Sequence, residues 1–305
     1  MVSGTTQALA ACVNSNFELD AAASDLQRRR QFASWVTHPD NPLFHRVMIN
    51  RLWQWHFGSG FVSTSSDFGF NGGQASHPEL LDWLCGELQR QNYQLKPLHR
   101  LMVSSQTYRQ SSAARPEAIA VDSDNRWLWR KSPVRLDAEI IRDSMLAVTG
   151  KLNPLRGGPG FKDVTIVDKG DGTTFYLERD AEEPDLNRRT IYRFSPRGGR
   201  SALLDSLDCP DPSTATPRRT VTTTPLQALS LLNSPFVLRM CGALAERAKR
   251  EHDSTEQQVI WMFRQVLSRA PAADELAAAV ELAEKHGAAA VARGLFNSSE
   301  FVTVR

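Results

Sequence analysis

The chain has 305 residues and a formal net charge of +2 at pH 7, with 41% hydrophobic and 23% charged side chains. This is the composition of a globular protein with enough apolar material for one large domain or two modest ones, and it excludes a disordered chain. The charge is too small for the strongly basic balance of most nucleic-acid-binding domains, so we expect no nucleic-acid partner.

No apolar run in the sequence approaches the roughly 20 residues that a membrane-spanning helix needs, so we expect no membrane span. Residues 1–23 show little periodicity and form the expected lead-in segment. They lack a basic stretch followed by a continuous apolar one, which argues against a signal peptide. Residues 24–305 predict one mainly α-helical domain of many helices, beginning with a helix over about 23–36.

The next predicted helix, over 42–57, has clear ends. Asn41 is a good N-cap, and Pro42 suits the first helical position, where the missing N–H is not needed. Gly58 can adopt the left-handed conformation that ends many helices. Apolar side chains cover about half of this helix, which is typical of a buried helix.

Four residues of this helix, Asn50, Arg51, Trp53 and His56, are candidates for a site. We favour the interpretation that Asn50 and Arg51 pair with the glycine-rich loop that follows, because an unpaired buried polar group costs about 1–3 kcal/mol. Trp53 then fills the core. Under the alternative interpretation, Asn50, Trp53 and His56 line a cleft beside these glycines.

The glycine-rich loop and the helix start after it hold three further candidates. Asp67 is predicted to accept hydrogen bonds in a turn or at a helix start. Ser76 and Glu79 fit a capping box at the start of a helix. His77, Glu79 and Asp82 have the side chains of a metal site, but their spacing does not aim all three at one point, so we expect no metal.

The remaining elements are predicted from periodicity, capping residues and glycines. Residues 151–200 form an irregular insert with a small β-ribbon. Thr224 and Gln227 fit a capping box, with Pro225 at the first helical position. The expected helices cover about 77–92, 96–110, 124–131, 135–150, 225–232, 235–250, 255–268, 272–286 and 288–296, and the expected strands cover 163–167, 174–178 and 189–194.

Carboxylates and arginines in and around the predicted helix 135–150 are the first candidates for chemistry. Glu139 and Asp143 are four residues apart, so their like charges repel unless Arg135 or Arg142 neutralises them. We favour a structural network of arginines and carboxylates. Under the alternative, one carboxyl group has a raised pKa and a pair works as general acid and base, as in glycoside hydrolysis. The candidates for catalysis are Glu139, Asp143, Asp208 and Asp211.

The segment 211–225 combines Ser and Thr hydroxyls with Arg218 and Arg219, just before a predicted helix start. Guanidinium groups, hydroxyls and a helix N-terminus together suit a sulfate or a carboxylate. The simpler interpretation, which we favour, is that these arginines pair with nearby aspartates. The candidates for anion binding in the whole chain are Arg135, Arg142, Arg218 and Arg219.

Six segments, taken in order, resemble one known family: NPLFHRVMINRLWQWHFGSGFVSTSSDFG, SHPELLDWL, KPLHRLMVSSQTYRQSS, RLDAEIIRDSMLAVTG, DPSTATPRRTVTTTPLQALSLLNSPFV and LFNSSEF. They are similar to the planctomycete-type domain of unknown function 1553, over roughly residues 28–305. The resemblance implies the C-terminal part of long exported proteins that often carry a c-type cytochrome module, and it implies no established activity. Because C-x-x-C-H is absent from this chain, we expect no haem or other cofactor in it.

These observations predict an extracytoplasmic-type helical module that binds a polysaccharide or a partner domain such as the upstream cytochrome-type module. The alternative is a carbohydrate-active hydrolase that uses the carboxylate pair. The expected location depends on the chain: extracytoplasmic if it is a fragment of the family's usual exported protein, and cytoplasmic if it is complete as given.

Overall fold

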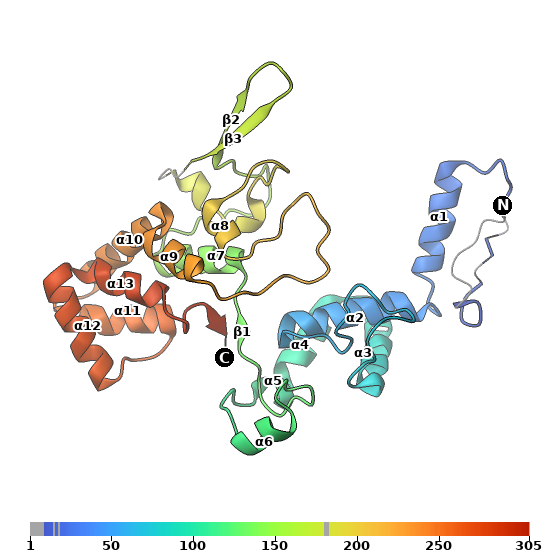
Figure 1. Ribbon diagram of the computed structural model, residues 1–305, viewed down its shortest axis with the longest axis horizontal. Coiled ribbons are helices and arrows are strands. Elements are labelled where there is room, and N and C mark those ends of the chain that lie inside the picture. Colours follow the sequence, from blue (N-terminus) through green and yellow to red (C-terminus); the bar gives the residue numbers. More distant parts are fainter. Residues whose placement is uncertain (1–8, 15, 18, 180–182, 305) are drawn as a thin grey trace. The chain divides into compact units, whose positions relative to one another are not determined.

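A computed structural model describes residues 9–14, 16–17, 19–179 and 183–304 of the chain. Thirteen α-helices and two small two-stranded sheets run through these residues (Figure 1). The predicted class, mainly α-helical with a small β insert, is therefore confirmed. Residues 1–8, 15 and 18 of the expected lead-in segment lie outside the described residues.

The chain forms two compact units, with the boundary in sequence between Val134 and Arg135. The sequence predicted one domain over 24–305. A single domain over these residues stays a prediction.

Unit 1, which ends at Val134, is built around three helices that pack on one another, α2, α3 and α4. Apolar residues three or four positions apart give each helix one inward face. These faces bury Ile49 and Leu52 of α2, Leu88 of α3 and Leu98 of α4, each at most 1% exposed. The helices of unit 1 are α1 (Asp25–Val36), α2 (Pro42–Phe57), α3 (Pro78–Arg90), α4 (Leu95–Ser104), α5 (Gln106–Arg109) and α6 (Pro116–Val121).

Both predicted ends of α2 are confirmed. The Asn41 side-chain oxygen accepts a hydrogen bond from the Leu43 N–H, at 3.1 Å, and Pro42 occupies the first turn. Gly58 has φ 84° and ends the helix in the left-handed conformation, which a residue with a Cβ adopts at a penalty.

The predicted Ser76–Glu79 capping box is wrong. The N-cap of α3 is His77, which has no side-chain capping bond. The Ser76 hydroxyl instead lies 2.9 Å from His77 Nδ1, and Glu79 is an exposed residue of the first turn. The short contact between Ser76 and the imidazole takes the place of the contact with the helix backbone.

The predicted helix over 124–131 is also wrong, because this segment forms turns. The two carboxylate oxygens of Asp122 accept hydrogen bonds from the N–H groups of Arg126 and Trp127, at 2.9 and 2.8 Å. Asn125 and Leu128 have positive φ values, 52° and 58°. A side chain that captures backbone donors in this way competes with a helix.

Unit 2, Arg135–Val304, holds the remaining helices and the β insert. Its helices are α7 (Ala138–Val148), α8 (Ala202–Ser206), α9 (Pro225–Asn233), α10 (Pro235–Glu251), α11 (Thr255–Leu267), α12 (Ala273–His286) and α13 (Ala288–Phe296). The capping box predicted at α9 is confirmed, because the Thr224 and Gln227 side chains each accept a hydrogen bond from the other residue's N–H.

The core of unit 2 is a layer of long helices. α10, α11 and α13 contact one another, and α7 lies against α10. Ile141, Leu244, Met262 and Phe296, one from each of these helices, are completely buried. Burial of a side chain of this size stabilises the folded state by about 1.5–3 kcal/mol, so this layer contributes much of the stability of the unit.

The insert contains a hairpin of β2 (Val164–Asp168) and β3 (Thr174–Glu178), paired antiparallel with Ile166 opposite Tyr176. It projects from the helices of unit 2 in Figure 1. The third predicted strand, 189–194, is wrong. A 3₁₀ turn over Thr190–Tyr192 lies there, because the Thr190 N–H donates to the Asp143 carboxylate instead of to a strand.

Two short strands, β1 (Val134–Arg135) and β4 (Thr303–Val304), form the second sheet. Among the described residues no single helix is long and apolar enough to span a membrane. The bent pair of α9 and α10, at 54°, meets that length and composition when the two are taken together.

Candidate functional site

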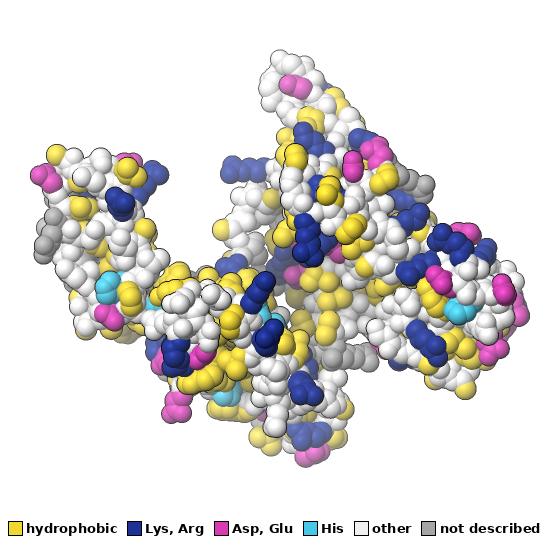
Figure 2. All heavy atoms as spheres, turned by 180° about the vertical axis from the view of Figure 1, so that it is seen from behind, with side chains coloured by type: hydrophobic (Ala, Val, Ile, Leu, Met, Phe, Trp, Pro, Cys, Tyr) yellow, Lys and Arg dark blue, Asp and Glu magenta, His cyan; other side chains and the backbone are white. Residues whose placement is uncertain are grey.

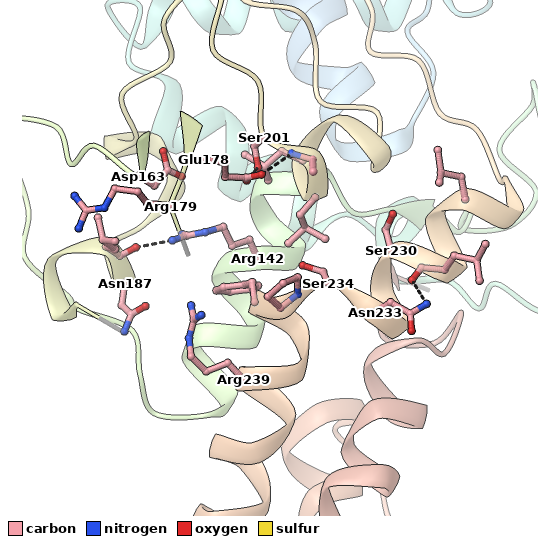
Figure 3. A pocket seen from close by; sticks show the side chains of 18 residues that line it. Arg142, Asp163, Glu178, Arg179, Asn187, Ser201, Ser230, Asn233, Ser234 and Arg239 are labelled. Carbon is pink, nitrogen blue, oxygen red and sulfur yellow. Dashed lines mark hydrogen bonds between the residues drawn. The ribbon is translucent and has the colours of Figure 1, made fainter. Parts of the chain in front are cut away.

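A pocket of about 550 Å³ lies in unit 2, where α7, α8, the junction of α9 and α10, and the foot of the β2–β3 hairpin meet (Figure 3). Its floor is apolar and its walls carry a small number of charged and amide groups, which is the usual character of a ligand pocket. The lining residues are Arg142, Asp163, Glu178, Arg179, Leu186, Asn187, Ser201, Ala202, Leu203, Leu204, Leu226, Leu229, Ser230, Asn233, Ser234, Pro235, Phe236 and Arg239.

Arg142 of α7 forms the inner wall of this pocket and is 8% exposed. Its guanidinium carbon lies 5.4 Å from the centroid of the Phe161 ring and 5.3 Å from that of the Phe236 ring. Cation–π contacts of this kind stabilise a desolvated guanidinium group. Burial lowers the pKa of Arg142, and the neighbouring Asp143 carboxylate opposes that effect.

The hydrogen bonds of Arg142 go to neutral acceptors. They run to the carbonyl oxygens of Leu186 and Arg188, at 2.6 and 3.1 Å, and to the Thr190 hydroxyl, at 3.1 Å. The Asp143 carboxylate lies 3.6 Å from Nη1. Arg142 is therefore fixed at the pocket wall by carbonyl oxygens, a hydroxyl group and one longer ion pair with Asp143.

Two carboxylates, Asp163 and Glu178, also line the pocket (Figure 3). Asp163 accepts a hydrogen bond from Arg193 Nε at 2.7 Å, while its other oxygen is buried without a partner among the described residues. Glu178, at the end of β3, accepts hydrogen bonds from the Ser201 hydroxyl and from the Ala202 N–H. Both carboxylates thus already have a donor that orients them.

The junction of α9 and α10 supplies the neutral polar groups. Ser234 is the N-cap of α10, and its side chain makes no capping bond. Asn233 donates to the Leu229 carbonyl oxygen and accepts from Arg293. One turn into α10, the Arg239 guanidinium lies 5.6 Å from the Phe236 ring centroid and points toward the pocket (Figure 3).

Lys and Arg side chains gather at the foot of the β2–β3 hairpin on the face of unit 2 shown in Figure 2. Arg142, Arg193 and Arg239 interact electrostatically in this region, together with Asp143 and Asp163. The pocket lining therefore combines guanidinium groups with the carboxylates of Asp163 and Glu178.

The catalytic candidate Glu139 is held by Arg219. Its two oxygens accept hydrogen bonds from Arg219 Nη1 and Nη2, at 2.6 and 2.9 Å. Burial opposes ionisation of Glu139, but the hydrogen bonds from Arg219 outweigh it, so the pKa of this carboxyl group lies below its usual value. A general acid needs a raised pKa, and the two-pronged pairing instead suits a structural ion pair.

The second candidate, Asp143, accepts hydrogen bonds from the Thr190 N–H and hydroxyl, at 2.8 and 2.6 Å. It thereby ties α7 to the insert. Arg189 Nε lies 3.8 Å from its other oxygen. The structure therefore places Glu139 and Asp143 in different contacts, although they lie on one helix, and neither is among the lining residues of the pocket.

Asp208 lies at the centre of a different network, to which two other predicted residues belong. Its carboxylate accepts hydrogen bonds from the Thr222 N–H and hydroxyl, both at 2.8 Å, and from Gln227 Nε2, at 3.0 Å. Arg135 Nη1 lies 3.3 Å from this carboxylate and donates to Gln227 Oε1 at 2.9 Å. The network joins the loop after α8 to the start of α9.

The remaining candidates of unit 2 lie apart from these groups. Asp211 pairs with Arg200 at 2.9 Å and accepts from the Ser213 N–H and hydroxyl. Arg218 is exposed, whereas its neighbour Arg219 reaches Glu139. The two arginines therefore lie in different surroundings, and an anion site at Arg218 and Arg219 stays a prediction.

In unit 1, the candidates of α2 lie in different surroundings. Asn50 is 1% exposed and hydrogen-bonds both polar groups of the Val62 backbone. Arg51 is exposed and lies over the Trp55 ring, 5.7 Å from its centroid. Trp53 stacks on Phe57 at 3.9 Å between ring centroids. Asn50 and Trp53 thus lie as the structural interpretation expects, whereas Arg51 contacts Trp55 of its own helix instead of the loop.

His56, at the end of the same helix, has a partner that the sequence did not indicate. Its Nε2 lies 2.8 Å from His99 Nδ1. Burial, His99 and Lys131 lower the pKa of His56. Lys131 is itself 4% exposed and donates to the His56 carbonyl oxygen, and burial lowers its pKa too.

Unit 1 has a pocket of its own, of about 350 Å³, beside the glycine-rich loop. Trp53 and Phe61 line it together with Gly60, Gln74 and Arg126, among others. The alternative interpretation of α2 expected a cleft here, and Trp53 does line one. Asn50 and His56 are not among its lining residues.

The other two candidates of unit 1 serve local structure. Asp67 accepts a hydrogen bond from the Gly69 N–H at 2.8 Å, which is a turn contact. His77 lies edge-on to Phe61 and Trp127. In the described part of the chain, His, Cys, Asp and Glu residues form no group of three that could hold a metal ion.

Sequence reasoning missed the residues that build the pocket around Arg142. Asp163 and Arg193 pair across 30 positions, and Asn187 and Arg239 meet the pocket from separate segments. Arg239 carried a weak signal, because it lies one turn inside a helix start that Ser234 and Pro235 had marked. The others lie in an insert without periodicity, where the spacing of residues does not indicate which way a side chain faces.

Comparisons with known proteins match this chain to one family. The model of PSD1, protein of unknown function (DUF1553), covers residues 28–283. Neither the curated proteins nor the solved structures include a match to the chain. The match spans well over half of the sequence and agrees with the six resembling segments, so the chain belongs to the family of proteins of unknown function DUF1553.

Proposed function

We propose that this domain is a binding module that holds an anionic segment of a polysaccharide in the pocket of unit 2. The observation that carries the proposal is the placement of Arg142, a buried guanidinium group fixed by carbonyl oxygens and aromatic rings at the pocket wall. Carboxylates and sulfates bind such groups through charge-assisted hydrogen bonds.

The other lining residues suit the rest of a sugar chain. Asn187, Asn233 and Ser230 offer amide and hydroxyl groups of the kind that hydrogen-bond sugar hydroxyls. Leu203 and Leu229 offer apolar surface for the non-polar faces of a ring. A few polar groups above an apolar floor give orientation as well as affinity.

Binding is favoured over hydrolysis by the contacts of the candidate carboxylates. Glu139 pairs with Arg219, and Asp208 accepts hydrogen bonds from Thr222 and Gln227. Glycoside hydrolysis needs two carboxyl groups on either side of a bound sugar, one of them with a raised pKa. The carboxylates that do line the pocket, Asp163 and Glu178, are each engaged by a neighbouring donor.

A polysaccharide ligand also fits an extracytoplasmic location, which the family resemblance implies for exported members. The alternative ligand, a partner domain such as a cytochrome-type module, would contact the exposed rim rather than fill a pocket of about 550 Å³. A bulky side chain placed inside the pocket should therefore prevent binding of a polysaccharide but not of a partner domain.

Calorimetric titration with three oligosaccharides of equal length tests the proposal: an oligogalacturonate, a chondroitin sulfate fragment and a neutral cello-oligosaccharide. We expect the charged pair to bind at low ionic strength and the neutral sugar to bind at least ten times more weakly. Arg239→Gln should weaken binding of the charged sugars about tenfold or more, because a charge-assisted hydrogen bond contributes about 1.5–3 kcal/mol. Arg264→Gln, at an exposed position of α11, removes the same charge as a control.

Ala202→Phe, which places a ring at the pocket wall, should abolish binding, while Ala278→Phe on the exposed face of α12 should not. Equal affinity for charged and neutral sugars would overturn the anionic specificity. Unchanged binding by Ala202→Phe would remove the ligand from this pocket.

A further inference from the structure

Arg239 lines two hollows of unit 2. A second pocket of about 520 Å³ lies along α10 and is lined by Lys151, Gly242, Glu246 and Arg250, among others. Asn187 and Arg239 line both pockets. The two hollows therefore adjoin at these residues, and together we call them the α10 groove.

The second part of the α10 groove adds positive charge. Lys151 and Arg250 line it, while its carboxylate, Glu246, lies 3.4 Å from the ammonium group of Lys249. Arg239 stands at the junction of the two parts, over the Phe236 ring. From Arg239 to Arg250, α10 rises by about 16 Å at 1.5 Å per residue, so the cations are spread along a line.

Gly242 keeps this groove open. It lies in the interior of α10, three residues after Arg239 and four before Glu246, and therefore on the face that carries them. A glycine weakens a helix interior relative to alanine. A Cβ built at Gly242 would meet no atom within 4 Å, so close packing within the fold does not require a glycine here.

We propose that the α10 groove binds an extended polyanionic glycan, with one charged sugar unit at Arg142 and a later one between Lys151 and Arg250. This inference rests on the proposed function, because it extends the same ligand along the helix. A ligand that reaches the second part makes its second contact intramolecularly, which raises its affinity without a new pocket.

The test uses oligogalacturonates of two, four, six and eight residues with the full chain. We expect the dissociation constant to fall at least tenfold between the shortest and the longest. Gly242→Leu, which fills the second part of the groove, should remove this gain and leave the shortest ligand unaffected. Gly294→Leu is the matched control, since Gly294 is an exposed interior residue of α13 whose Cβ would also meet no atom within 4 Å.

The outcomes separate the two proposals. If no oligogalacturonate binds, the proposed function fails and this inference fails with it. If the shortest binds and is lost in Ala202→Phe, but length adds nothing or Gly242→Leu leaves the gain intact, the function stands and the extended groove is wrong. Equal binding of linear polyphosphate with the same dependence on Gly242 would overturn the assignment to a glycan.

Discussion

Asn50 of α2 holds Val62 through both ends of its amide: Nδ2 donates to the Val62 carbonyl oxygen at 3.0 Å, and Oδ1 accepts from the Val62 N–H at 2.8 Å. These two hydrogen bonds satisfy both polar groups of the Val62 backbone, as a neighbouring strand would do in a sheet. It is the reason why a polar residue stands in the buried face of an otherwise apolar helix, and it fixes the loop that leads to Phe61.

Replacement of Asn50 by Ala should therefore destabilise unit 1. Both Val62 groups would be left buried without partners, and each costs about 1–3 kcal/mol, so we expect a loss of about 2–6 kcal/mol. Six of the seven tryptophans lie before Val134, so urea unfolding followed by tryptophan fluorescence reports on this unit. Arg51→Ala, next to it but exposed, should change the free energy of unfolding by less than about 0.5 kcal/mol. Equal effects of the two changes would show that the amide contact is not what stabilises the loop.

Gly60 is required by the same contact. A Cβ at this position would lie 2.6 Å from both amide atoms of Asn50, which is too close for either to stay in place. We expect Gly60→Ala to destabilise unit 1 by more than 1 kcal/mol, in the range of overpacked cores, about 1–3 kcal/mol. Gly294→Ala should instead stabilise unit 2 by about 0.5–1 kcal/mol, as expected for a glycine in a helix interior. A stabilised Gly60→Ala protein would contradict the geometry around Asn50.

The ion pair of Glu139 and Arg219 predicts a dependence of stability on acid. The pKa of Glu139 is lower in the folded state than its usual value of 4.5. Its contribution to stability is therefore fully present above that value and is lost as the pH falls through the lower pKa of the folded state. Thermal unfolding between pH 6 and pH 3 should show a steeper loss of Tm for the native chain than for Glu139→Gln. Parallel curves would mean that the pair contributes nothing measurable.

His56 predicts a second dependence of the same sense, at higher pH. Burial, with smaller effects of the nearby His99 and Lys131, lowers the pKa of His56 below 6.5, so the folded state disfavours its protonated form. Its stabilising effect is present when the imidazole is neutral and is lost as the pH falls through 6.5 and below. We expect unit 1 to lose stability between pH 7 and pH 5, and His56→Gln to reduce this loss. His286→Gln, at an exposed position of α12, serves as the control; a loss that survives in His56→Gln would have to come from another group.

The sequence by itself determined the mainly α-helical class, the ends of α2 and the helices from α9 to α13. These features depend on local chemistry: apolar spacing, capping side chains and glycines act within a few residues. The same information was wrong over 124–131, where the Asp122 carboxylate captures backbone donors that a helical periodicity would assign to a helix.

Only the tertiary structure decided which charged side chains meet. Glu139 and Asp143 share one helix face in sequence, yet one reaches Arg219, 80 positions away, and the other reaches Thr190, 47 positions away. The pocket gathers Arg142, Asp163 and Arg239 from segments that spacing does not relate. Long-range partners of this kind are set by the packing of whole elements, and a charge pattern along the chain does not specify them.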